Sequence, residues 1–134
     1  MVTVLLSGGL GNQMFQYAAA KSLATRLNAP LYLNTYTLTK KTQATARNYE
    51  LDIFKLKPTF SSSLKGKWFI KARPFIQKHR NLFIKLGFVT DTYAILYQPI
   101  FEKLRGNIIL SGYFQNEQYF RNIRQDILED FTFN

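Results

Sequence analysis

The fold is decided near the N-terminus by the stretch VTVLLSGGLGNQMFQYAAA, residues 2–20. It opens with a continuous, β-branched apolar run over 2–6, which is typical of a strand buried on both faces of a parallel sheet. Three glycines follow, and over 12–27 apolar residues recur at helical spacing, which predicts an amphipathic helix. A second strand is predicted over 31–34. The order strand, glycine turn, helix, strand is the first unit of a doubly wound, Rossmann-like α/β fold.

The second half of the chain repeats this pattern. Residues 108–114 read as another apolar strand that runs into a glycine, and residues 116–130 are predicted to be helical. Helices are also expected around Pro74, but short ones, because proline breaks or begins a helix. The sequence therefore predicts a three-layer α/β domain with its first strand in the centre of the sheet.

Length and composition bound the possible functions. The chain has 134 residues, with 18 Lys and Arg against 8 Asp and Glu, one His and no Cys. A chain of this size buries enough surface to form one globular domain. Without cysteine it has no disulfide framework, thiolate metal site or cysteine nucleophile, and one histidine excludes a multi-histidine metal site.

Cellular location follows from the same features. The apolar run at the N-terminus is too short for a signal peptide core or a membrane span, and the lack of cysteine fits a reducing compartment. We expect the protein in the cytoplasm, with peripheral attachment to the inner face of the membrane as the alternative.

A basic stretch lies between Ile53 and Thr90. It contains nine Lys and Arg residues, no acidic residue, and interleaved aromatic side chains. Three interpretations stay open: helices with solvated basic faces and inward aromatics, a surface for an anionic membrane, or a nucleic-acid patch. No recognised nucleic-acid motif is present, so we expect no nucleic-acid partner. We predict a basic helical insertion around 55–90, packed at one side of the domain.

Chemistry is concentrated in the first turn, at Gly8, Gly9, Gly11, Asn12 and Gln13. Glycines at a helix N-terminus let backbone N–H groups approach a phosphate or a sugar hydroxyl closely. Of the two adjacent amides, one can cap the helix and the other can bind a ligand. The spacing matches neither a dinucleotide fingerprint nor a phosphate loop. A tight turn that needs positive φ is the purely structural alternative.

Three segments carry a resemblance to a known family. GGLGNQMFQYA over 8–18 is similar to the N-terminal signature of the α-1,2-fucosyltransferases, glycosyltransferase family 11. RNYEL over 47–51 and SGYFQNEQYF over 111–120 resemble two further segments of this family, in the same order. Asn116 and Gln118 stand where the family commonly has Ser and Lys.

The resemblance implies an activity and an architecture. It implies inverting transfer of L-fucose from GDP-fucose to the 2-hydroxyl of a galactose-containing glycan, with no cofactor and no obligatory metal. It also implies the two-lobed GT-B architecture. The family's donor motif, His-x-Arg-Arg-x-Asp, is absent from this chain, so we expect residues 1–134 to be the N-terminal lobe and to be inactive alone. The expected partners are the nucleotide-sugar donor, the galactoside acceptor and the missing C-terminal lobe.

Several residues in the matched segments are candidates for binding substrate. They lie in the glycine turn, in the second segment and at the end of the later strand, where open α/β sheets bind ligands. The candidates are Gly8, Gly9, Gly11, Asn12, Gln13, Arg47, Tyr113 and Gln115. Arg47 can instead brace a neighbouring carboxylate, and the aromatic side chain of Tyr113 can instead pack in the core.

The catalytic base is left unassigned. Inverting transfer can use a carboxylate to accept the acceptor proton, and the weak candidates are Glu50, Asp52 and Glu117, each of which can also be structural. A catalytically inactive module that binds a sugar or nucleotide, or that docks on a membrane surface, is the alternative function.

Overall fold

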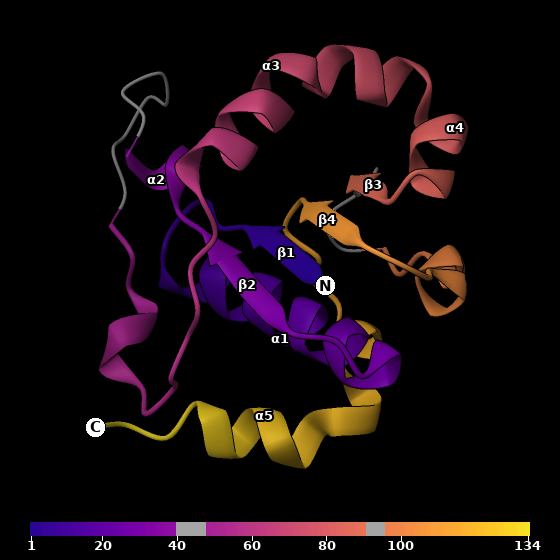
Figure 1. The fold of residues 1–134 in the computed structure, drawn as a ribbon. Coiled ribbons are helices and arrows are strands. Elements are labelled where there is room, and N and C mark those ends of the chain that lie inside the picture. Colours follow the sequence, from indigo (N-terminus) through magenta and orange to yellow (C-terminus); the bar gives the residue numbers. More distant parts are fainter. Residues whose placement is uncertain (40–47, 91–95) are drawn as a thin grey trace.

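A computed structural model describes residues 1–39, 48–90 and 96–134 of the chain (Figure 1). Within these residues the strands form one four-stranded sheet in the order β2-β1-β4-β3, and every neighbouring pair is parallel. The strands are β1 Val2–Leu5, β2 Leu31–Asn34, β3 Phe88–Thr90 and β4 Ile108–Ser111. The first strand is therefore interior, as predicted.

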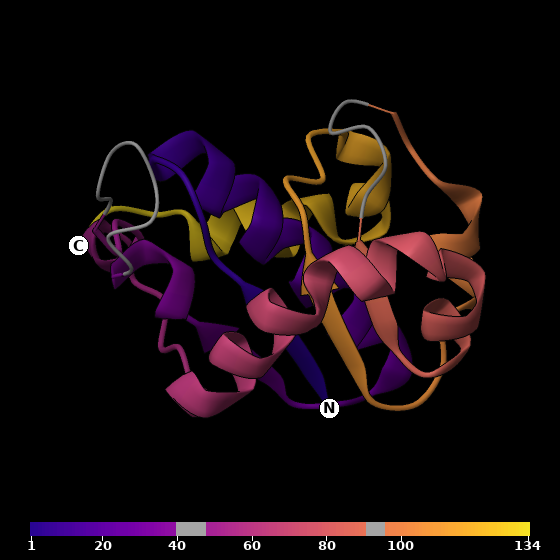
Figure 2. The ribbon, with the colours of Figure 1, turned by 90° about the horizontal axis from the view of Figure 1, so that it is seen from above.

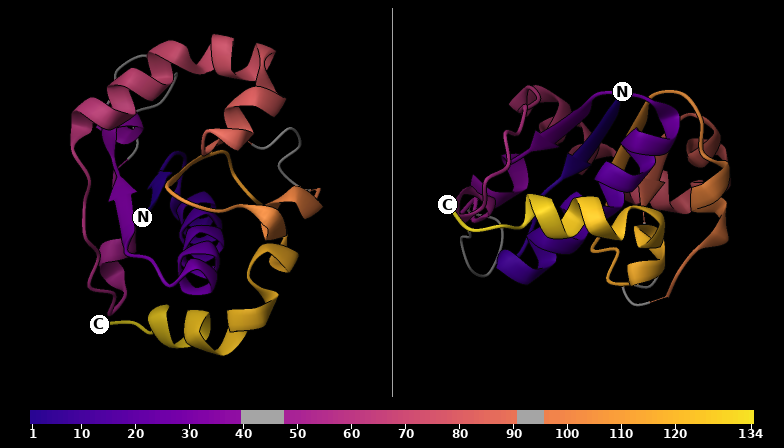
Figure 3. Two further views of the ribbon diagram at one scale, coloured as in Figure 1. Left: turned by 45° about the vertical axis from the view of Figure 1, so that its right-hand side comes forward. Right: turned by 90° about the horizontal axis from the view of Figure 1, so that it is seen from below.

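Helices cover both faces of this sheet. α1 (Leu10–Leu27) packs on one face, and α5 (Arg124–Asp130) lies alongside it, as the views in Figure 3 show. α3 (Ser63–Lys78) and α4 (Arg80–Lys85) cover the opposite face and connect β2 to β3 (Figures 1 and 2). The prediction of a Rossmann-like, three-layer α/β domain is confirmed. The stretch expected as an insertion thus contains the second helical layer.

β1 joins the two halves of the core. Alternate side chains of a strand point to opposite faces of the sheet. Val4 and Leu6 belong to the core under α1, whereas Leu5 packs with Phe69 and Ile76 of α3. All five side chains are almost fully buried. This double burial explains why the run over 2–6 is apolar at nearly every position.

α3 does not follow the expectation of short helices around Pro74. It continues through this proline as one helix of 16 residues. Proline lacks the N–H that would donate to the preceding turn, and a helix that contains it bends. α3 curves as it crosses the sheet (Figure 1). Phe69 and Ile76, on either side of Pro74, are completely buried, and their packing holds the helix together.

The helix predicted over 116–130 is wrong in its first half. Short 3-10 turns form at Glu117–Tyr119 and Arg121–Ile123, and only then does α5 begin. Tyr119 is buried, with its ring perpendicular to that of Phe114 at a centroid distance of 5.3 Å. This packing fixes the backbone before α5 in turns instead of a continuous helix.

The remaining short elements are α2 Tyr36–Thr39 and the 3-10 turns Leu51–Ile53 and Pro99–Lys103. None of the helices in the described ranges combines the length and the apolar character needed to cross a bilayer.

Candidate functional site at the carboxyl edge of the sheet

The predicted site residues converge where the strand order switches direction. β1 and β4 are neighbours in the sheet, with Leu5 opposite Ser111 at their carboxyl ends. The chain leaves β1 toward β2 on one side and arrives at β4 from β3 on the other. Open parallel sheets bind ligands in the crevice outside such a switch point. The glycine turn after β1 and the loop after β4 both lie at this edge.

The glycine turn begins α1 without a side-chain cap. Gly8 adopts a φ of 74°, a conformation that side chains other than glycine rarely take, and a Cβ there would collide with the side chain of Asn12. Gly9 is the N-cap residue, and α1 starts at Leu10, two residues earlier than predicted. The prediction that Asn12 or Gln13 caps the helix is therefore wrong, because both lie inside the first turn.

The side-chain amide of Gln13 forms all of its observed hydrogen bonds with backbone groups of the protein. Its side chain is completely buried, and its Nε2 donates to the carbonyl oxygens of Gly8, at 3.0 Å, and Asn48, at 2.8 Å. Its Oε1 accepts the backbone N–H of Glu50 at 2.9 Å. All of these polar contacts are internal to the protein, and the role of Gln13 in substrate binding stays a prediction. The residue holds the segment 48–50 against the glycine turn.

A residue that the sequence analysis did not select joins the two loops. Gln16 is completely buried, and its Oε1 accepts the backbone N–H of Ser7 at 2.9 Å. Its Nε2 donates to the hydroxyl oxygen of Ser7 and to the carbonyl oxygen of Gly112, each at 2.9 Å. A glutamine one turn after Gln13, on the buried side of an alanine-rich helix, was the available signal for this structural role.

Asn12 and Gln115 meet across the same gap. The Nε2 of Gln115 donates a hydrogen bond to the Oδ1 of Asn12, although the two residues are 103 positions apart. Both side chains are partly exposed. In the loop after β4, Tyr113 has 40% of its surface exposed, whereas Phe114, with a φ of 51°, is buried in the core. The partly open polar surface of the site is therefore formed by Asn12, Gln115 and Tyr113.

The three candidate carboxylates lie in different places. Glu50 is half-buried, and its backbone is anchored to Gln13 beside the glycine turn. Asp52 is exposed, and its carbonyl oxygen accepts a hydrogen bond from the side chain of Asn134. Glu117 is exposed at the start of a 3-10 turn. Of the three, Glu50 is the one whose backbone N–H donates to the side chain of a residue in the first turn, Gln13. Arg47, the expected brace, lies outside the described residues.

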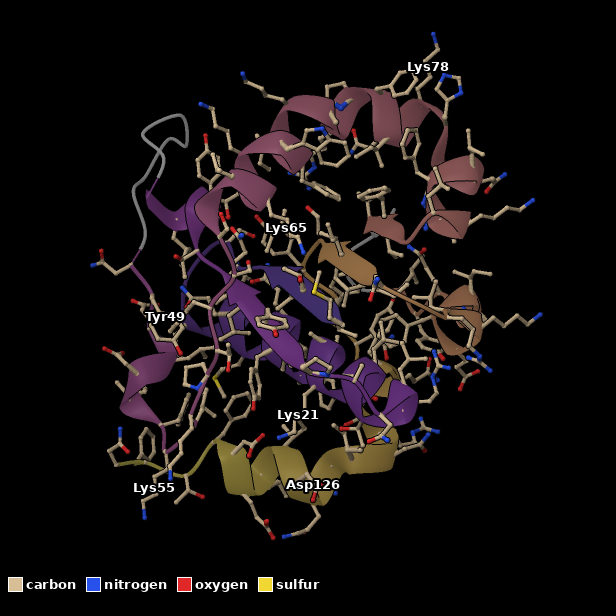
Figure 4. The ribbon with its side chains drawn as sticks, in the orientation of Figure 1. Lys21, Tyr49, Lys55, Lys65, Lys78 and Asp126 are labelled. Carbon is tan, nitrogen blue, oxygen red and sulfur yellow. The ribbon has the colours of Figure 1, made fainter. Side chains whose placement is uncertain are left out.

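The segment that carries Glu50 is also packed against the edge of the sheet. The ring of Tyr49 lies edge-on to that of Phe60 at a centroid distance of 5.3 Å, and Figure 4 shows Tyr49 on the β2 side of the molecule. Burial, and to a lesser degree the negative charge of Asp52, raises the pKa of Tyr49. Tyr49 is therefore neutral near pH 7 and acts there as a packing residue.

Arg73 is a partly buried basic residue on the sheet-facing side of α3. It lies between Phe69 and Ile76 on the helix face that packs against Leu5, the last residue of β1. The Nε of Arg73 is buried and has no hydrogen-bond partner in the described structure. Sequence analysis counted Arg73 only among the basic residues of its stretch, because the face of α3 that meets the sheet is set by the tertiary structure.

Of two hollows in the described structure, neither encloses the predicted site residues. One of about 400 Å³ is lined by Tyr17, Lys21, Lys57 and neighbouring residues, and none of the predicted site residues lines it. A smaller, apolar hollow of about 240 Å³ is bordered by Gly11 and Phe15 of α1 and by Phe120. Across the described ranges, no three acidic or histidine side chains gather in a way that could hold a metal ion.

Comparison with known proteins identifies a relative. The chain is 31% identical to an alpha-1,2-colitosyltransferase of Escherichia coli over an alignment of 142 positions that covers 98% of this chain and 45% of the relative. The chain thus spans about half the length of the relative that it matches. No family model matches the sequence. No solved structure matches it either. This homology agrees with the resemblance carried by the three sequence segments, and the chain corresponds to the N-terminal part of the α-1,2-glycosyltransferase that it matches.

Proposed function

We propose that this chain forms one wall of the active site of an α-1,2-glycosyltransferase that transfers L-fucose from GDP-fucose to the 2-hydroxyl of a galactose-containing glycan, with inversion. The observation that carries the proposal is the convergence of the glycine turn and the loop after β4 at the switch point of the sheet. The name of the E. coli relative adds GDP-colitose as a second candidate donor. Colitose is fucose without its 3-hydroxyl. The two donors therefore differ at one hydroxyl, and the same sugar pocket could bind either of them.

The turn suits the polar part of such a donor. α1 has 18 residues and presents its first N–H groups and the positive end of its dipole beside Gly9 and Gly11. A Cβ added at Gly11 would meet no atom within 4 Å, so this position is open. Asn12, Gln115 and Tyr113 supply hydroxyl and amide groups of the kind that bind sugar hydroxyls.

A leaving nucleoside diphosphate also needs a positively charged partner. Hydrogen bonds between a guanidinium and a phosphate are among the stronger ones in proteins, and they stabilise charge that develops as the bond breaks. Arg73, with its buried and unpartnered Nε on the sheet-facing side of α3, is our candidate for this contact within the chain. A second lobe, as in the GT-B architecture, completes the donor site in this proposal.

Glu50 is our candidate for the base that accepts the acceptor proton. The backbone N of Glu50 lies 2.9 Å from Gln13 Oε1, beside the glycine turn, whereas Asp52 and Glu117 are exposed. A positioned carboxylate can perform this step. We further propose that the transfer needs no metal, so that EDTA leaves the rate unchanged.

The test has a binding arm and a transfer arm. The chain is titrated with GDP-fucose, GDP-colitose and UDP-glucose and followed by saturation-transfer NMR. In parallel, the chain alone and the chain joined in register to the remaining sequence of the E. coli relative are incubated with donor and lactose, and the product is identified by mass spectrometry. We expect binding of the GDP sugars, no transfer by the chain alone, and transfer by the chimera.

Each other outcome has a definite meaning. Failure of both GDP sugars to bind would contradict the proposal. Binding without transfer by a folded chimera would favour the alternative, a catalytically inactive sugar- or nucleotide-binding module. Transfer from GDP-colitose but not from GDP-fucose would correct the donor and keep the reaction class.

A further inference from the structure

The outward face of α3 combines apolar and basic side chains. Leu64, Trp68 and Phe75 expose 72%, 50% and 59% of their surface. Lys67, Lys71 and Lys78 are exposed as well. At helical spacing these six residues share one side of α3, opposite the buried Phe69 and Ile76. We call these six residues the outer face.

α4 extends this surface. Leu82 and Leu86 expose 57% and 59% of their surface, and Lys85 is exposed between them. In Figures 1 and 2, α3 and α4 form one continuous layer on the outside of the sheet. Figure 4 shows the side chain of Lys78 pointing away from the body of the molecule. Exposed apolar side chains therefore occur on both helices of this layer.

The charge of this surface has no internal counterpart. The sequence contains no acidic residue from Ile53 to Thr90. In the part of the chain that the structure describes, the salt bridge is formed by Lys21 and Asp130, at 2.8 Å, on the other side of the sheet. The lysines of the outer face thus present uncompensated positive charge to the solvent. The complementary partner is an anionic surface.

The exposed side chains decide between the two anionic partners that the sequence left open. Nucleic acid is bound through phosphate contacts, which need Lys and Arg but no exposed Leu. A helix that lies in a membrane interface has Leu, Phe and Trp that insert between headgroups and Lys that bind anionic lipids. Tryptophan in particular favours the headgroup level of a bilayer. Leu64, Trp68 and Phe75 beside three lysines fit this second pattern.

We propose that the outer face of α3, continued by α4, docks on the surface of an anionic lipid bilayer. The apolar side chains enter the headgroup region, and the lysines bind negatively charged lipid headgroups. This inference does not depend on the glycosyltransferase activity, because the outer face is separate from the glycine turn and from the loop after β4.

The protein carries its own probe for this contact. Trp68 is the single tryptophan of the chain, and it lies in the outer face. The chain is mixed with vesicles of phosphatidylcholine alone, or of phosphatidylcholine with about one third phosphatidylglycerol. Tryptophan emission, its quenching by iodide, and co-sedimentation with the vesicles are measured at low salt and at about 0.5 M NaCl. We expect a blue shift, protection from iodide and sedimentation with the anionic vesicles at low salt only.

Charge-reversal variants locate the contact. Lys67→Glu with Lys71→Glu is expected to reduce the fraction bound at least about tenfold. Arg121→Glu with Arg124→Glu makes the same change in net charge at exposed positions outside the outer face, and it is expected to bind much more tightly than the first pair. Leu64→Ser, at the most exposed apolar position, is expected to weaken binding without affecting the fold.

The negative results are equally definite. The absence of any vesicle-dependent change in Trp68 emission for the unmodified chain would overturn the proposal, and this measurement requires no variant to fold. Equal loss of binding in both charge-reversal pairs would overturn the outer face as the contact. Salt-sensitive binding of a single-stranded RNA homopolymer that displaces the protein from vesicles would show that nucleic acid is the preferred partner.

Discussion

The Nε2 of Gln16 donates a hydrogen bond to the carbonyl oxygen of Gly112 at 2.9 Å, and this bond joins the turn after β1 to the loop after β4. The Oε1 and Nε2 of the same side chain also bind the backbone and the hydroxyl of Ser7. One buried amide therefore sets the separation of the two loops that form the candidate site. Asn12 and Gln115 reach their mutual hydrogen bond across this fixed gap.

Replacing Gln16 by Met tests this role at nearly constant volume. The change leaves the N–H of Ser7 and the carbonyl of Gly112 without their buried partner, and each unpaired group costs about 1–3 kcal/mol. We expect the free energy of unfolding in urea to fall by about 2–4 kcal/mol. Gln77→Met, at an exposed position of α3, is the matched control and should change stability little. Equal effects of the two substitutions would contradict the role of Gln16.

The glycines of the first turn are expected to respond in opposite ways to alanine. Gly8→Ala places a Cβ at positive φ and against Asn12, so it should destabilise the protein by about 1–3 kcal/mol. Gly11→Ala meets no atom within 4 Å inside α1, so it should stabilise the protein by about 0.5–1 kcal/mol. Thermal unfolding measures both.

Ligand binding then separates structure from function at Gly11. If a donor phosphate or sugar approaches the helix N-terminus closely, Gly11→Ala lowers GDP-fucose affinity while the fold becomes more stable. An unchanged affinity would show that the ligand does not reach this position.

Arg73→Met removes the candidate contact for phosphate and keeps most of the apolar stem. We expect the Kd for GDP and for GDP-fucose to rise at least about tenfold, because hydrogen bonds to charged groups contribute about 1.5–3 kcal/mol. Stability should stay the same or increase, since the substitution removes an unpartnered buried nitrogen. Lys103→Met, an exposed charge loss, is the control for titration calorimetry. A loss of stability with unchanged Kd would assign Arg73 a structural role.

Tyr17 is expected to make the fold sensitive to alkaline pH. Its hydroxyl donates to Asp130 Oδ2 at 2.7 Å, and burial, followed by this hydrogen bond, raises the pKa of Tyr17 above its ordinary value. Above about pH 10 the unfolded chain loses this proton while the folded chain keeps it, so stability falls as pH rises.

The comparison of wild type with Tyr17→Phe isolates this contribution. Burial also raises the pKa values of Tyr49 and Tyr97, but those residues are present in both proteins. Between about pH 10 and 11, the unfolding free energy of the wild type should fall faster than that of the variant, by up to about 1.4 kcal/mol per pH unit. Parallel pH dependences in urea titrations would show that Tyr17 titrates alike in both states.

Several elements could be predicted because their signals are local. The apolar run over 2–6 identified an interior strand, and β2 was predicted at its observed bounds, Leu31–Asn34. β3 was not predicted, because three residues are too few to show a period and Phe88–Thr90 pairs with a distant segment. Pro74 misled the prediction since the burial of Phe69 and Ile76 outweighs the local preference of proline.

In the candidate site, too, local features could be predicted and contacts between distant residues could not. The glycines and amides of the first turn were recognised from their types and spacing, and their location at a strand end follows from the order of the elements. The partners of Gln13 and Gln16 could not be predicted, because Asn48 and Gly112 are 35 and 96 residues away in the sequence. Those partners determine which side-chain amides stabilise the fold and which stay available to bind a ligand.

The amino-acid sequence by itself determined the α/β class, the central strand, the glycine turn and the resemblance to α-1,2-glycosyltransferases, since each depends on residues close together in the chain. The tertiary structure alone decided that Gln13 and Gln16 are buried and hydrogen-bonded to distant segments, that Arg73 lies on the sheet-facing side of α3, and that Leu64, Trp68 and Phe75 keep half or more of their surface exposed. These properties depend on contacts between distant segments and on which face of a helix packs against the sheet. The contacts and the helix orientation are both determined by the packing of the whole chain.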